Sequence, residues 1–153
     1  MRSRRIVAAP GREGKSHVTH DETVPPADEG QSVQLTNLWM GPIAKLDDKT
    51  SFAGGFVPFT MSQLSADAYA MTLVDYAPGV GQIDPGMHST PTVDHFHVVE
   101  GEIVLVLETE ETRLRVGDTG IIRGVAHGWR NDAAVKARLL FFTLPATADG
   151  IPT

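Results

Sequence analysis

Apolar and polar residues alternate through most of the chain from Met71 onward. The segments AMTLVDYAPG, HFHVVE, EIVLVLE and EETRLRVGD are typical of strands, and TGIIRG, HGWRN and AVKARLLFFTLP supply three further candidates. No stretch of this half shows the 3.6-residue period of an amphipathic helix, and 15 glycines and 10 prolines punctuate the chain. The pattern therefore predicts an all-β fold, an antiparallel barrel or sandwich with little helix.

The N-terminal part is less regular. RRIVAAP and KSHVT predict two short strands joined by the loop GREG, and the acidic, proline-containing stretch HDETVPPADEGQ (20–31) predicts an exposed connector. SVQLTNLWM reads as another strand, and GPIAKLDDKTSFAGGF as a loop. A length of 153 residues favours one domain, 1–153, with N-terminal strands and connector in 1–31 and the core of the barrel in 71–145.

The alternation also predicts which residues face inward. The apolar runs on either side of EGE are consistent with a hairpin that turns at Glu100-Gly101. Since a barrel points every second residue of a strand inward, we expect an apolar, aromatic-bearing cavity. Its interior candidates are Phe96, Val98, Val104, Val106, Trp129 and part of RLLFFTL.

Composition excludes several classes of function. The net charge of −6 gives no electrostatic case for binding nucleic acid or an anionic membrane. No apolar run approaches the roughly 20 residues of a transmembrane helix, and IVAAPGREGK turns polar too early for a signal peptide, so a cytoplasmic location is expected. Without cysteine, any metal must be held by His, Asp, Glu or other oxygen donors.

Histidine gathers in MHSTPTVDHFHVVEG (87–101), which holds three of the six histidines and one aspartate. A further histidine, His127, lies far along the chain in GVAHGWRN, and a barrel can bring the two segments side by side. Two imidazoles and a carboxylate on adjacent strands suit a divalent ion such as Zn²⁺, Fe²⁺, Mn²⁺ or Ni²⁺. Without a metal, the same groups suit proton transfer.

The first of these segments resembles a motif of the cupin superfamily. The family motif has a His-x-His pair, a glutamate after three or four residues, and a glycine after six more. This chain has His88-Ser-Thr90, then Asp94, then Gly101. Threonine therefore stands in the place of the second histidine, and aspartate in the place of the glutamate.

The second segment, GDTGIIRGVAHGWRN (117–131), resembles the other cupin motif through Gly117, Gly124, His127 and Asn131, with Arg123 at the family's proline position. The spacer EIVLVLETEETRLRV has the family's usual length, and the resemblance covers about the C-terminal half of the chain. It implies an antiparallel cupin jelly-roll β-barrel. It does not fix a function, because one fold hosts many unrelated activities.

Carried over position by position, the resemblance implies that His88, Asp94 and His127 are the catalytic residues and the ligands of any metal. With three ligands at best, one divalent metal or no cofactor at all both stay open. Strand alternation turns His95 and His97 away from a cavity that Asp94 faces, unless a bulge intervenes. Thr90, Phe96 and Trp129 are the candidates for substrate binding.

The resemblance favours an enzyme acting on a small aromatic or polyketide-like compound by non-redox lyase, cyclase or isomerase chemistry. Two alternatives stay open: an Fe(II)-dependent dioxygenase, for which two histidines and a carboxylate suffice, and a non-catalytic small-molecule-binding cupin. A homodimer is expected because cupin barrels often pair edge strands, and the strands around RRIVAAP are candidates for that contact. The expected partner is a small organic substrate, with neither nucleic acid nor membrane.

Overall fold

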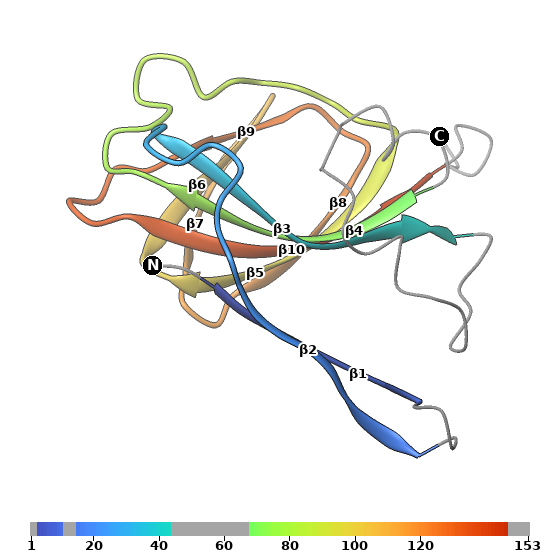
Figure 1. Ribbon diagram of the computed structural model, residues 1–153. Coiled ribbons are helices and arrows are strands. Elements are labelled where there is room, and N and C mark those ends of the chain that lie inside the picture. Colours follow the sequence, from blue (N-terminus) through green and yellow to red (C-terminus); the bar gives the residue numbers. More distant parts are fainter. Residues whose placement is uncertain (1–2, 11–14, 44–67, 147–153) are drawn as a thin grey trace.

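The computed structural model describes residues 3–10, 15–43 and 68–146, and within them every strand pairing is antiparallel (Figure 1). One sheet has five strands in the order β3-β4-β10-β5-β8, and another has three in the order β7-β6-β9. The five strands are β3 (Val33–Pro42), β4 (Ala68–Tyr76), β10 (Ala137–Pro145), β5 (Thr92–Glu100) and β8 (Thr119–Arg123). The three are β7 (Glu111–Arg115), β6 (Glu102–Leu107) and β9 (His127–Arg130).

A single apolar cluster joins the two sheets. Its buried members come from β4, β5, β8 and β10 on one side and from β6 and β9 on the other. Leu139 and Val98 are completely buried at its centre. The all-β fold that the alternation predicts is confirmed, since the described residues form ten strands and no α-helix.

The inward residues of β6 differ from the expected ones. Ile103 lies in the apolar cluster and Leu105 packs against it, whereas Val106 is only half-buried. Val104 is buried but is not a member of the cluster. The run EIVLVL has apolar residues at odd and even positions alike. Alternation alone therefore did not identify which face of the strand turns inward.

The predicted hairpin at Glu100-Gly101 is wrong. β5 ends at Glu100 and β6 begins at Glu102, but β5 pairs with β10 and β8 while β6 pairs with β7 and β9. Gly101 has a φ of 74°, and a side chain there would meet the carbonyl oxygen of Lys136. The turn therefore sends the chain from one sheet to the other, and glycine permits both the backbone angle and the close approach.

A separate hairpin of β1 (Ser3–Pro10) and β2 (Ser16–Val24) projects away from the two sheets (Figure 1). The predicted connector is shorter than expected, because β2 continues through HDETV to Val24. The acidic residues of this stretch pair with arginines of β1: Arg4 with Asp21, and Arg5 with Glu22. Cross-strand pairing of opposite charges explains why an acidic segment joins a sheet. The connecting GREG loop lies outside the described residues.

No helix in the described ranges is long and apolar enough to cross a membrane. The predicted loop GPIAKLDDKTSFAGGF begins within β3, which reaches Pro42, and from residue 44 on it lies outside the described residues.

Asn131 ties three parts of the fold together. Its completely buried side chain donates hydrogen bonds to the carbonyl oxygens of Tyr76 and Val135 and accepts one from the backbone N–H of Ala133. The side-chain amide of Asn131 thus connects the end of β4, the end of β9 and the turn into β10. An amide suits this position because it offers both donors and an acceptor.

We predict that Asn131→Ala lowers the free energy of unfolding by about 2–4 kcal/mol, because one buried and two partly buried backbone groups lose their partner. Urea unfolding monitored by circular dichroism measures the change. Gln82→Ala, which truncates an exposed amide, is the matched control and should stay within about 0.5 kcal/mol of the parent. Equal losses in both variants would contradict the role of Asn131.

Candidate functional site

A cavity of about 140 Å³ opens between the two sheets. β4, β10, β5, β9 and the segment before β5 line it with Thr72, Val74, Tyr76, His88, Thr90, Thr92, Asp94, His127, Trp129, Phe141 and Thr143. Five of the six candidate residues from the sequence therefore meet here: His88, Thr90, Asp94, His127 and Trp129. The cavity combines an apolar wall with hydroxyl, imidazole and carboxylate groups.

Backbone hydrogen bonds bring His88 and His127 together. The N–H of each donates to the carbonyl oxygen of the other, both at 2.9 Å, and the two imidazole centroids lie 4.4 Å apart. The segment before His88 continues this pairing along β9, since the N–H of Trp129 donates to Pro85 and that of Asn131 to Val80. An irregular segment thereby pairs with the edge of β9 that does not face β6.

Gly128 makes this pairing possible. A Cβ atom at this position would lie 2.5 Å from the carbonyl oxygen of Pro85, too close for any side chain. The residue between His127 and Trp129 must therefore be glycine if the segment is to approach β9. In the sequence HGW, the glycine thus contacts Pro85, and the side chains of His127 and Trp129 on either side of it line the cavity.

The hydrogen bonds of the imidazoles fix their tautomers. The Nδ1–H of His88 donates to the carbonyl oxygen of Gly86 at 2.8 Å, and that of His127 donates to Val125 at 3.0 Å. A carbonyl only accepts, so Nδ1 of each neutral ring carries the proton and Nε2 keeps its lone pair. His127 is buried, whereas His88 is exposed at the mouth of the cavity.

Burial lowers the pKa of His127 below its ordinary value of 6.5, and the neighbouring His88 adds to the effect. The hydrogen bond to Val125 and the charge of Asp94 act in the opposite direction, but the lowering prevails. His127 is therefore held neutral at physiological pH, the state in which it can accept a proton.

Asp94 and Tyr76 carry the remaining strong polar groups. Asp94 is 9% exposed and has no hydrogen-bond partner within the described part of the chain. Burial, and then the charge of Asp94, raise the pKa of Tyr76 well above its usual range, so its phenol stays protonated. The cavity thus contains a carboxylate that can accept hydrogen bonds and a phenol that can donate one.

Threonine replaces the second histidine of the family motif with a hydroxyl group. The Oγ1 atoms of Thr90 and Thr92 lie 2.7 Å apart and share a hydrogen bond. Thr143 stands directly opposite Asp94 on β10, and Thr72 lines the same cavity from β4. These hydroxyls surround the carboxylate with neutral groups.

The donor set does not fit a divalent ion as it stands. No three His, Asp or Glu side chains of the described ranges are placed to hold one ion together, although the two imidazoles lie side by side. Divalent ions of this kind need at least three protein ligands in a catalytic site. A bound metal therefore stays a prediction.

His95 and His97 lie on the face of β5 that points away from the cavity, as the alternation predicts. The Nδ1 of His97 is 2.9 Å from the hydroxyl of Thr119 on β8. His95 stands between Phe142 and Ile121 on the neighbouring strands. Neither imidazole lines the cavity.

The two aromatic candidates have different positions. Trp129 lines the cavity and contacts Phe96 edge-on, with ring centroids 5.3 Å apart. Phe96 is buried in the apolar cluster and is not among the lining residues, so it supports Trp129 from behind. Phe141 supplies a second aromatic wall, 5.8 Å from Trp129.

Sequence reasoning missed part of this lining. It did not single out Tyr76, Thr72, Phe141 or Thr143. Alternation within β4 could have identified part of this lining, since Thr72, Val74 and Tyr76 are alternate residues that point to the same face of the strand. Which strand lies opposite Asp94 depends on non-local register, which one sequence does not contain.

Residues 72–143 match the family model described as Cupin domain. This chain contains a cupin domain. The match includes the strands and motifs that carry the cavity, and the cupin domain of Cnp3 from Schizosaccharomyces pombe has the same fold. That structure superposes with a TM-score of 0.58 over 100% of this chain and 98% of its own, at 13% identity. The cupin jelly-roll predicted from the motifs is confirmed.

Relatives by sequence are fungal proteins named as biosynthesis cluster proteins or as cupin-domain-containing oxidoreductases. Oryzines biosynthesis cluster protein J of Aspergillus oryzae is 44% identical over 75 residues, 48% of this chain and 40% of that protein. The cupin-domain-containing oxidoreductase fogC of Aspergillus ruber is 34% identical over 82 residues, 51% of this chain and 39% of that protein. The matches thus span about two fifths of each relative's length.

The neutral state of His127 makes stability depend on pH. Its folded pKa lies below 6.5, so the unfolded chain binds more protons between the folded pKa and 6.5. The contribution of neutral His127 to the free energy of unfolding is fully present above pH 6.5 and is lost as the pH falls toward the folded pKa. We predict a smaller unfolding free energy at about pH 5 than at about pH 7.5, and a weaker pH dependence in His127→Asn. Urea titrations at both pH values test this, and identical slopes for parent and variant would contradict it.

Proposed function

We propose that this protein is a small-molecule cupin of secondary metabolism that catalyses proton transfer beside a carbonyl group without redox chemistry. The observation that carries the proposal is the neutral, buried imidazole of His127, whose Nδ1 is held by Val125 and whose Nε2 keeps its lone pair in the cavity. The names of the fungal relatives support a role in a biosynthetic pathway.

His127 acts as the general base. Its Nε2 takes a proton from the carbon beside the carbonyl, and the C–H electron pair moves onto the carbonyl oxygen to form an enolate. Isomerisation follows when the imidazolium returns this proton to another carbon of the conjugated system, which regenerates the neutral imidazole. The charge of Asp94 favours the imidazolium and so assists the first step.

Tyr76 and the mouth residues position the substrate. The protonated phenol of Tyr76 donates a hydrogen bond to the oxygen on which negative charge develops, a form of stabilisation that usually contributes strongly. His88 at the mouth is the second proton carrier, exchanging protons with solvent because it is exposed. Thr90 and Trp129 contact the substrate from opposite parts of the lining.

The size and charge of the cavity limit the substrate. A volume of about 140 Å³ accepts roughly one six-membered ring, because apolar cavities of about 150 Å³ hold benzene. The described lining residues include Asp94 but neither lysine nor arginine, so a neutral compound is favoured over a carboxylate or phosphate. We therefore expect a neutral, ring-bearing carbonyl compound whose remaining part extends through the mouth.

Deuterium exchange tests the proposed base. Cyclohexanone in D₂O serves as the probe, and NMR follows deuterium entering the carbons beside the carbonyl. We predict that His127→Gln slows the protein-catalysed exchange by at least about 100-fold, since general bases contribute that much or more. His17→Gln, which alters an exposed imidazole on the hairpin, is the control and should exchange like the parent. Equal exchange by parent and His127→Gln would contradict the proposal, and exchange by neither would favour a binding protein.

An iron-dependent oxidoreductase is the second candidate. Relatives named cupin-domain-containing oxidoreductases favour it, as does the Nδ1–H to carbonyl hydrogen bond on both imidazoles, which is common among metal-bound histidines. Against it stands the absence, in the described ranges, of three converging His, Asp or Glu donors.

Elemental analysis separates the two candidates. For protein purified without added metal, we predict substoichiometric iron, zinc, manganese and nickel, and unchanged cyclohexanone exchange after dialysis against a chelator. An oxygen electrode and plasma mass spectrometry provide the measurements. Stoichiometric iron together with substrate-dependent oxygen uptake would replace the non-redox proposal with the oxidoreductase.

A further inference from the structure

Asp94 is the only buried carboxylate among the described residues, and the fold gives it no partner. Other large polar side chains of the interior are bonded. Arg138 forms a two-fold hydrogen bond with Asp75, and Asn131 holds three backbone groups. Buried charges in proteins are as a rule paired, so an unpaired buried carboxylate calls for an explanation.

The carboxylate of Asp94 is open to the cavity. The side chain lines the cavity, and neither of its oxygens is among the atoms that the described residues cover completely without a partner. The hydroxyls of Thr90 and Thr92 in the same lining are bonded to each other. The missing partner of Asp94 therefore belongs to a molecule that enters the cavity.

That partner must donate a hydrogen bond, because an ionised carboxylate only accepts. Solvent supplies donors while the cavity is open. A ring compound that fills about 140 Å³ displaces the solvent, and an apolar group in its place leaves the charge buried without a partner. A site with such a group rejects compounds that lack the matching donor.

A neutral donor suits the proposed reaction better than a cation does. The charge of Asp94 assists proton transfer to His127, and a cation bound to Asp94 would cancel this assistance. A hydroxyl group completes the hydrogen bond and leaves the negative charge in place. The partner that fits is therefore a hydroxyl group of the substrate.

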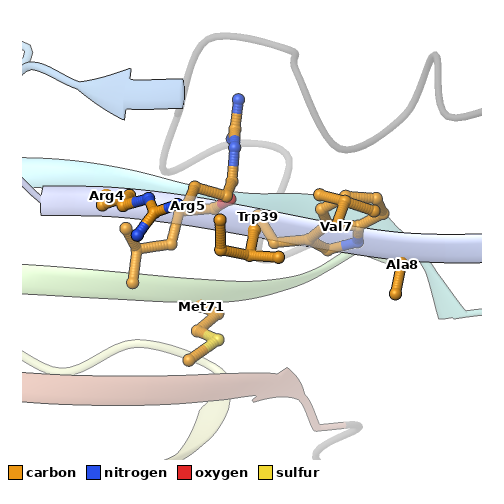
Figure 2. Close-up of a pocket in the computed structure, with 8 residues that line it drawn as sticks. Arg4, Arg5, Val7, Ala8, Trp39 and Met71 are labelled. Atoms are coloured by element: carbon orange, nitrogen blue, oxygen red, sulfur yellow. The ribbon is translucent and has the colours of Figure 1, made fainter. Parts of the chain in front are cut away.

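A second hollow of the molecule offers different chemistry. It has a volume of about 560 Å³, and Figure 2 shows Arg4 and Arg5 of β1 around it together with Trp39 and Met71. Both arginines are paired with carboxylates of β2. No carboxylate lines this hollow within the described part of the chain, so a hydroxyl compound finds no unpaired negative charge there.

We propose that Asp94 selects substrates that carry a hydroxyl group, from which it accepts a hydrogen bond inside the cavity. This selection rests on the proposed function and extends it: the carbonyl oxygen of the substrate accepts a hydrogen bond from Tyr76, and its hydroxyl group donates one to Asp94. The two oxygens together fix the orientation of the ring relative to His127. The expected substrate is therefore a neutral ring compound with both a carbonyl group and a hydroxyl group.

Fluorescence titrations with two ring compounds of nearly the same shape test the proposal. Cyclohexanol carries a hydroxyl group, whereas fluorocyclohexane carries a fluorine atom that cannot donate a hydrogen bond. Trp39→Phe serves as the parent, because the chain has two tryptophans and Trp129 then reports on the cavity alone. We predict that this parent binds cyclohexanol at least about tenfold more tightly than fluorocyclohexane.

Variants of this parent locate the preference. Asp94→Ala, with its fold checked by circular dichroism, should reduce the preference to within about threefold, because the acceptor is gone. Asp28→Ala, which removes an exposed carboxylate outside the cavity, is the matched control and should keep it. Urea unfolding adds a structural readout. Asp94→Asn keeps the shape and removes the charge, and it should unfold at a urea concentration no lower than the parent's, since no hydrogen bond within the fold is lost.

Equal binding of the two compounds, or binding of neither, would overturn the proposal. So would an unchanged preference in folded Asp94→Ala, a lower urea midpoint in Asp94→Asn, or tighter binding of cyclohexylammonium than of cyclohexanol, which would indicate a cation site. Cyclohexanol lacks the carbonyl group that deuterium exchange requires, so its binding is independent of the proposed reaction. If cyclohexanone exchange fails while the preference persists, the reaction is wrong but Asp94 remains a hydroxyl-binding residue.

Discussion

The two reciprocal backbone hydrogen bonds between His88 and His127 hold the cavity in its present form. They fasten an irregular segment to β9, and the same pairing continues to Pro85 and Val80. These backbone hydrogen bonds fix the Cα positions of both residues, and the Nδ1–H hydrogen bonds to the carbonyl oxygens of Gly86 and Val125 then fix the orientation of the rings. The close approach requires Gly128, so one residue without a side chain determines where two imidazoles meet.

The placement of charge follows from this geometry. Asp94 is nearly buried in a cavity whose other polar groups include the neutral imidazole of His127, the phenol of Tyr76 with its raised pKa, and threonine hydroxyls. A carboxylate in such surroundings attracts positive charge wherever it develops. Burial disfavours the protonated form of an imidazole, and the nearby carboxylate favours it. One cavity can therefore hold a neutral base and still stabilise its conjugate acid.

The sequence contained enough information for the fold and for most of the cavity. Alternation identified the strands, and the two motifs brought His88, Asp94 and His127 into one place. It could not predict where the chain goes after Gly101. Two apolar strands on either side of a tight turn have the same sequence pattern whether they pair with each other or, as here, belong to different sheets. Nor could it give the cross-strand partners of Asp94, since register is fixed by contacts between distant segments. The missed residues Phe141 and Thr143 depend on such contacts, whereas the alternation within β4 could have identified Tyr76.

β10 links the cavity to the outer face. Phe141 and Thr143 line the cavity, while Phe142, between them in the sequence, lies on the opposite face of the five-stranded sheet, where it is 41% exposed. A strand that is packed on both faces has fewer alternative positions than one packed on a single face, because a shift costs contacts on each side. Groups that bind or act on a substrate must be held to within about 0.5 Å, so the packing of β10 bears directly on where the cavity-lining side chains of Phe141 and Thr143 lie.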